Sequence, residues 1–168
     1  MSGRVEVGAT LAPDWLRQAF RHYPTGVAIV TAWTDDGPVG LTVSSLASVS
    51  AEPPVLSFSV VTRTRSAGAL LTADAVAVHV LAQEHADLAE AFARSGAPRF
   101  TPSQGWVVEA GSPPRLPDAV VRLVGSIRQT VPVAGSELVL LDVATTVLGP
   151  PSTPLLHLDR RYRTLGGE

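Results

Sequence analysis

The chain has 168 residues, of which 45% are hydrophobic and 17% charged, and its net charge is −2. This length fits one domain of ordinary size, and the composition is that of a folded protein with a substantial core. The charge offers no basic surface for nucleic acid or a membrane, and the lack of cysteine excludes disulfides, thiolate catalysis and cysteine–metal sites. We find no signal-peptide pattern and no apolar run of bilayer length, so a cytoplasmic location is expected.

The first third of the chain predicts a tail, a helix and two paired strands. Residues 1–12 are interpreted as a flexible tail, ahead of a single domain over residues 13–168. Asp14 is expected to cap a short helix with apolar residues on one face, which Pro24 would end. Residues 26–33 and 39–45 predict strands joined by a hairpin-type turn at residues 35–38.

The middle of the chain continues with strands and short helices. Residues 55–61 alternate apolar and polar side chains, as a half-buried strand does. Ser66 is expected to begin a short helix that runs through Leu71. Residues 76–81 predict another strand, and residues 85–94 predict a helix.

The last part of the chain predicts a loop and then long strands. Residues 95–117 are rich in Gly, Pro and Ser and predict a loop, with Trp106 as a lid or a packing anchor. Residues 119–131 and 137–148 predict long strands, followed by a short strand over 155–158 and a basic tail at 160–163. Many strands, few helices and no alternating β–α order predict a mainly antiparallel barrel with helical caps.

The motifs of several enzyme classes are missing. There is no phosphate-binding glycine loop, no dinucleotide fingerprint and no nucleophile elbow. Asp35 and Asp36 are interpreted as turn residues. No metal site is expected, because the histidines lack ligand spacing and each is interpreted as a surface or core residue: His22, His79, His85 and His157. No side chain stands out as a catalytic acid, base or nucleophile, which favours chemistry supplied by a bound cofactor.

The run from Gly40 to Pro54 is the most informative part of the chain. It follows a turn and carries five hydroxyl side chains. Buried hydroxyls need hydrogen-bond partners, so such a run suits a surface that binds a flat polar ligand through main-chain groups and short side chains.

With these features, the chain resembles the short-chain flavin reductases, which are the reductase components of two-component flavin monooxygenases. The matching segments are residues 20–27, 39–45, 48–50, 53–54, 65–66, 78–81, 89–92, 99–100, 154–156 and Tyr162. The resemblance implies an FMN-binding split β-barrel, antiparallel and of Greek-key type, with short capping helices. It also implies a homodimer with flavin at the subunit interface.

The activity that the resemblance implies is that of an NAD(P)H:flavin oxidoreductase. Such an enzyme reduces FMN or FAD by hydride transfer from NADH or NADPH and supplies free reduced flavin to a partner monooxygenase. The sequence decides neither between the two flavins nor between the two hydride donors.

The resemblance also implies the residues that hold the flavin. Residues 38–42, 44 and 45 match the lining of the isoalloxazine ring, and residues 59–61, 65 and 66 match the contacts to the ribityl chain and phosphate. The implied cofactor-binding residues are Pro38, Val39, Gly40, Leu41, Thr42, Ser44, Ser45, Ser59, Val60, Val61, Arg65 and Ser66.

The chemistry of these residues fits the implied roles. Gly40 would let the backbone approach a flat ring, hydroxyls can bond to the ring carbonyls, and Arg65 can pair with phosphate. Ser66 is a candidate N-cap beside main-chain N–H groups that favour anions. The ordinary alternative is that Ser44 and Ser45 are edge-strand serines and Ser66 is a plain cap.

The chain departs from the family at four positions. Gly135-Ser136-Glu137 stands where many members have Gly-Asp-His, so Glu137 replaces a histidine that lies near the nicotinamide or flavin. His79 replaces an asparagine, Pro98 an acidic residue, and Asp142 a glycine. The catalytic side chains therefore stay unknown. The loss of the histidine leaves open a non-catalytic or differently specialised flavin-binding protein, and a third interpretation is a structural dimeric barrel without cofactor.

Overall fold

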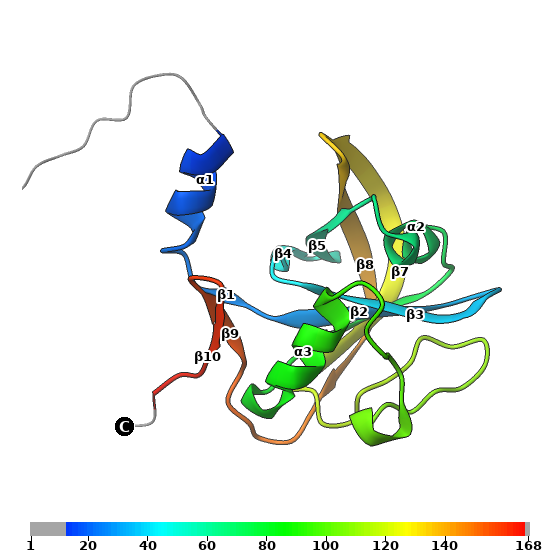
Figure 1. Ribbon diagram of the computed structural model, residues 1–168. Helices are drawn as coiled ribbons and strands as arrows, with labels where there is room; N and C mark the ends of the chain where they lie inside the picture. The colour runs from blue at the N-terminus through cyan, green and yellow to red at the C-terminus, as the bar shows by residue number, and fades with distance from the viewer. Residues whose placement is uncertain (1–12, 167–168) are drawn as a thin grey trace, which may run out of the picture.

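The computed structural model describes residues 13–166 and shows a strongly curved antiparallel sheet with short helices around it (Figure 1). The main sheet has the strand order β3-β2-β6-β7-β8-β5-β4. Its strands are β2 (Ala28–Thr34), β3 (Gly37–Val43), β4 (Ala47–Ala51), β5 (Pro54–Val61), β6 (Val76–Val80), β7 (Val121–Val133) and β8 (Ser136–Leu148). The predicted mainly antiparallel β fold is confirmed.

The helices are short and lie outside the sheet. They are α1 (Pro13–Phe20), α2 (Arg65–Leu71) and α3 (Ala86–Ala93), with the 3-10 turns η1 (Gln83–His85) and η2 (Pro102–Gln104). Asp14 was expected to cap α1, but this helix already includes Pro13, whose fixed φ suits the first helical turn. Asp14 therefore lies within the first turn. The predicted tail over residues 1–12 lies outside the described residues.

A small second sheet joins the two ends of the described chain. It pairs β1 (Thr25–Gly26) with β9 (Leu156–Leu158) and β9 with β10 (Arg161–Arg163). The predicted basic tail at residues 160–163 is thus wrong for 161–163, which form a strand. Tyr162 explains the difference, because its ring packs at 5.9 Å from that of His157 and against the neighbouring hydrophobic core.

The strands enclose one core and cover a second. Alternate residues of β2 and β5, such as Val30 and Phe58, point into the barrel with β6 and β8. On the outer side of β2, Ile29 packs with α3 and with Trp106 of the long loop. Strand β2 is therefore buried on both faces, and the structure places Trp106 as a packing anchor. Within residues 13–166, no helix combines the length and the apolar character that crossing a bilayer requires.

Candidate functional site

A cavity of about 690 Å³ lies where the hydroxyl-rich end of β3 meets the end of β5, the start of α2 and the end of α3. Three arginines line it, Arg63, Arg65 and Arg99, and we call it the arginine pocket. Nine of the twelve predicted cofactor-binding residues line this pocket: Leu41, Thr42, Ser44, Ser45, Ser59, Val60, Val61, Arg65 and Ser66. The structure therefore brings together segments that lie far apart in the sequence.

Two of the hydroxyls expected to meet a ligand are already bonded within the protein. Thr42 Oγ1 donates to the carbonyl of Ala89 in α3 at 2.6 Å. Ser45 Oγ accepts from the Ser59 N–H at 2.8 Å and lies 3.3 Å from the Ser59 carbonyl oxygen. These bonds hold the walls of the pocket together and leave oxygen lone pairs for a ligand donor. Ser44 is exposed and has no side-chain hydrogen bond to any part of residues 13–166.

The remaining three predicted residues, Pro38, Val39 and Gly40, lie beside the pocket and are not part of its lining. Gly40 is buried, and a Cβ on it would lie 2.8 Å from Phe92 Cε1 and 3.0 Å from Phe100 Cζ. The close approach that this glycine permits in the structure is therefore to two phenylalanine rings. Its approach to a flavin ring stays a prediction.

Arg99 joins three elements around the arginine pocket. Its Nη1 donates to the Gly40 carbonyl of β3 at 2.8 Å and to Ser66 Oγ of α2 at 3.1 Å. Its Nη2 donates to the carbonyl of Arg94, the residue after α3, at 2.8 Å. The guanidinium carbon lies 5.6 Å from the centre of the Phe92 ring, within cation–π range. Burial lowers the pKa of Arg99, and an arginine stays charged at neutral pH all the same.

The expected N-cap of α2 is wrong by two residues. Thr64 is the cap: its backbone is extended, and its Oγ1 accepts from the Ala67 N–H at 3.2 Å. Ser66 already lies inside the helix, where its hydroxyl cannot reach an amide of the first turn in this way. Its oxygen accepts from Arg99 instead.

Arg65 begins α2, lines the arginine pocket and forms an ion pair with a residue outside that pocket. Its Nη2 lies 3.1 Å from Oδ2 of Asp36, in the turn between β2 and β3. The two side chains are 90% and 80% exposed. The expected contact of Arg65 with a phosphate stays a prediction.

Sequence reasoning did not assign Arg63, Arg99, Phe92 or the loop residues 95–97 to the site, although all line the pocket. The pair Arg99-Phe100 belongs to the segments that carry the resemblance. An arginine beside a phenylalanine in a Gly-, Pro- and Ser-rich loop is a weak signal by itself, because its partners come from β3, α2 and α3 and are separated from it along the chain.

Glu137, at the position of the family histidine, pairs with Val60 of β5, so the two side chains share the inner face of the sheet. Its Oε2 is buried and has no hydrogen-bond partner among residues 13–166. Val60 lines the arginine pocket and Glu137 does not.

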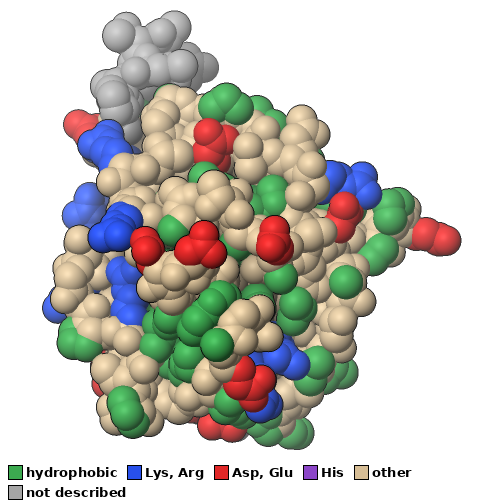
Figure 2. Space-filling model, turned by 90° about the vertical axis from the view of Figure 1, so that its right-hand side faces the viewer, with side chains coloured by type: hydrophobic (Ala, Val, Ile, Leu, Met, Phe, Trp, Pro, Cys, Tyr) green, Lys and Arg blue, Asp and Glu red, His purple; other side chains and the backbone are tan. Residues whose placement is uncertain are grey.

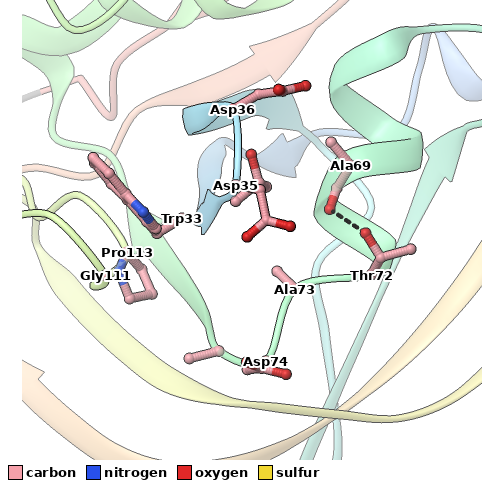
Figure 3. Close-up of a pocket in the computed structure, with 11 residues that line it drawn as sticks. Trp33, Asp35, Asp36, Ala69, Thr72, Ala73, Asp74, Gly111 and Pro113 are labelled. Atoms are coloured by element: carbon pink, nitrogen blue, oxygen red, sulfur yellow. Dashed lines mark hydrogen bonds between the residues drawn. The ribbon is translucent and has the colours of Figure 1, made fainter.

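A second cavity of about 690 Å³, the hairpin pocket, lies at the tip of the β2–β3 hairpin (Figure 3). Trp33, Asp35 and Asp36 line it from the hairpin, and Asp74 lines it from the chain after α2. In Figure 3 the Asp35 carboxylate points into this cavity, and the Asp36 side chain extends away from it. Volume does not distinguish the two cavities, but charge does. Carboxylates repel a phosphate and arginines attract it, so the arginine pocket is the candidate site for an anionic cofactor.

Among the described residues, His79 is the one titratable side chain that is completely buried. Its Nδ1 lies 3.2 Å from the Ile29 carbonyl oxygen, and its ring stands edge-on to Trp106 at 5.2 Å. Burial lowers the pKa of His79 to about 4, with a smaller lowering by the charge of Arg122. The interpretation as a core histidine is confirmed. Among residues 13–166, no group of three or more His, Asp or Glu side chains is arranged to hold a metal ion.

Residues 20–166 match the model of the flavin reductase like domain. The NADH:FMN oxidoreductase of Rhodococcus qingshengii is 33% identical over 151 residues, covering 87% of this chain and 78% of the relative. The actinorhodin polyketide dimerase of Streptomyces coelicolor is 36% identical over 155 residues, covering 89% and 85%. Other matches are named as reductases of monooxygenases for trigonelline and styrene.

Comparison of the fold with solved structures agrees with these sequence matches. The NADH:FAD oxidoreductase SgcE6 of Streptomyces globisporus, solved with NAD and FAD fragments, matches with a TM-score of 0.85 at 27% identity, covering 96% of this chain and 98% of that one. The predicted split-barrel fold of the flavin reductases is thereby confirmed. The chain belongs to the family of proteins with a flavin reductase like domain.

Proposed function

We propose that this protein is an NAD(P)H:flavin oxidoreductase that reduces FMN or FAD and releases the reduced flavin to a partner monooxygenase. The observation that carries the proposal is the arginine pocket, in which the hydroxyl-rich end of β3 and the start of α2 form one cavity. Membership of the flavin reductase family and relatives named as NADH:FMN oxidoreductases support it. A cytoplasmic location is part of the proposal, because the nicotinamide donors are available there.

The residues of the pocket suit a cofactor with a phosphate at one end and a flat polar ring at the other. Arg63 and Arg65 offer positive charge near the start of α2, and Arg99 adds a charge at the end of the loop after α3. Val61, which is 55% exposed, offers apolar surface for a ring. Ser44, which has no internal partner in the described part of the chain, offers a hydroxyl that can donate or accept.

In this proposal the protein binds the flavin, orients it and releases it. Bound flavin supplies the hydride chemistry for which no side chain of the pocket is suited. The Thr42–Ala89 and Ser45–Ser59 bonds fix the distance between the pocket walls, and a fixed geometry brings donor and acceptor within reach of each other. Much of the rim is exposed, including Ser59 and Arg63, which suits a flavin that enters and leaves in each cycle.

We also propose a homodimer, supported by an apolar stripe next to the pocket. Val61 and Val133 both pair with Ser136, and Leu138 pairs with Val131 and with Ser59. Directly paired residues share a face of the sheet, so these apolar side chains lie on the face of Ser59. The stripe consists of Val61, Val131, Val133 and Leu138, which are 55%, 37%, 56% and 38% exposed. A second copy seated there would also cover one side of the arginine pocket, since Val61 lines both.

A differently specialised flavin-binding protein is the second candidate. Two observations favour it: Glu137 stands in place of the family histidine, and a relative at 36% identity is named as a polyketide dimerase. This candidate predicts a protein that keeps flavin through gel filtration and does not oxidise NADH or NADPH.

Oxidation of NADH and of NADPH, each with FMN and with FAD in air, tests the first proposal. We expect turnover that depends on added flavin, and the best pair of substrates then identifies the donor and the flavin. Turnover would also show that Glu137 is compatible with hydride transfer. No turnover in a sample that binds flavin, as a titration of its fluorescence shows, would overturn the reductase assignment in favour of the second candidate.

A further inference from the structure

We infer that Asp36 sets the affinity of the arginine pocket for anionic flavins, by holding Arg65 in an ion pair that a flavin phosphate must displace. The inference rests on the proposed function and goes beyond it, because it assigns a role in cofactor release to a carboxylate outside the pocket lining.

The geometry places one guanidinium between two possible partners. Arg65 lines the arginine pocket from the first turn of α2, and its Nη2 lies 3.1 Å from Asp36 Oδ2. Asp36 belongs to the turn of the β2–β3 hairpin and lines the hairpin pocket, not the arginine pocket. Figure 2 shows the side of the molecule toward which this hairpin points, and acidic and basic side chains lie next to one another on it. A phosphate in the pocket and the Asp36 carboxylate therefore compete for Arg65.

The other two pocket arginines have no such competitor among residues 13–166. Arg99 donates to two carbonyls and to Ser66 Oγ, which are neutral acceptors. Arg63 forms no ion pair within that part of the chain. Asp36 is thus the carboxylate that is paired with an arginine of this pocket.

The strength of the competing pair suits a cofactor that must leave. Both side chains are largely exposed, and exposed ion pairs are weak and screened by salt. A phosphate can therefore displace Asp36, at a moderate loss of binding free energy. The effect is a pocket that recognises the phosphate and yet binds it less tightly than three unopposed arginines would.

The test compares D36N with D35N. Each variant removes one negative charge from the same turn, and asparagine is as common in turns as aspartate, so both hairpins are expected to form. Asp35 has no ion pair within the described residues, and its carboxylate points into the hairpin pocket (Figure 3). D35N therefore controls for the change in net charge.

The dissociation constants of FMN and of riboflavin, which lacks the phosphate, are measured by fluorescence titration. We expect D36N to bind FMN roughly two- to fivefold more tightly than the wild type, the range that a surface ion pair allows. Riboflavin binding is expected to stay unchanged, as is FMN binding by D35N. The gain is expected to shrink at high salt. It is also expected to be absent without Arg65, that is, when D36N/R65M is compared with R65M.

The inference alone would be overturned by FMN binding that D36N and D35N change equally, or by a gain that persists without Arg65. The inference would also be overturned if the wild type binds FMN and D36N binds it no more tightly. A wild-type protein that binds neither FMN nor FAD would overturn the proposed function, and this inference with it.

Discussion

At the scale of single residues, His79 shows how burial turns an ionisable side chain into a packing group. Its Nδ1 faces the Ile29 carbonyl and its ring meets Trp106, so the neutral form fits the outer core of β2. A protonated ring would carry a charge into this core, where Arg122 is nearby and no carboxylate of residues 13–166 faces it. The residue therefore couples the stability of the fold to pH.

We expect this coupling to appear between the two pKa values of His79. The unfolded chain takes up a proton below the ordinary value of 6.5, and the folded protein does so only near 4. Because the unfolded state binds more protons in this window, stability is complete above pH 6.5 and falls as the pH is lowered towards 4. The loss is roughly 3 kcal/mol in full.

The measurement is urea unfolding of the wild type and of H79N from neutral to acid pH. Asparagine keeps a donor for Ile29 and does not titrate, so H79N is expected to lose less stability than the wild type over this window. Equal pH dependence of the two proteins would contradict the role of His79, because the remaining acid-sensitive groups are common to both.

Residue types alone indicated part of the site. The alternation of 55–61 placed Phe58 inward and Ser59 outward, as the structure has them. Gly40 shows the limit, because the sequence does not predict that this glycine makes room for Phe92 and Phe100. Those rings lie more than fifty residues further along the chain, and local patterns carry no information on such contacts.

At the scale of elements, Arg99 connects β3, α2 and the end of α3 with one side chain. The guanidinium can serve three acceptors in different directions because it is planar and carries five N–H donors. A lysine at this position has a charge of the same sign, but its three N–H donors are all on one nitrogen. The connection between the elements, more than the charge, is then what the arginine contributes.

We expect R99K to bind FMN roughly five- to tenfold more weakly than the wild type, because it loses hydrogen bonds that hold the pocket walls. R99K is also expected to have a slightly lower melting temperature than the wild type. R128K is the matched control, since Arg128 pairs with Asp142 on β7 and β8 and does not line the pocket. FMN titration of both variants is the measurement, and an R99K protein with wild-type affinity would show that charge alone suffices.

Element boundaries were harder to predict than the elements themselves. Serine is a common cap, so the sequence predicts the start of α2 at Ser66, yet Thr64 has the extended backbone that a cap requires. The sequence predicts a basic tail at 160–163, because the pairing of 161–163 with β9 depends on where β1 lies in space. Both errors concern choices that tertiary contacts decide.

At the scale of the whole molecule, the apolar stripe beside the arginine pocket is the surface on which the proposed dimer depends. Leu138 lies in its middle by register, between Ser59 and Val131. Lysine at this position would place a charge in the interface, where burial without a partner is unfavourable. The family resemblance implied a dimer, but the sequence alone did not show which strands would present the contact surface.

L138K is therefore expected to be a monomer at a concentration at which the wild type is a dimer. L148K is the matched control, because Leu148 is 77% exposed and lies at the other end of β8. Light scattering after gel filtration gives the masses. If the wild type is dimeric and L138K remains so, the stripe is not the interface.

Strand β2 lies between the two cores, with Val30 in the barrel and Ile29 against α3. One wall of the arginine pocket comes from β3, the hairpin partner of β2, and the opposite wall from α3. We therefore expect the barrel and the layer outside it to unfold together. A flavin bound between these walls would then stabilise both layers against unfolding, not α3 alone.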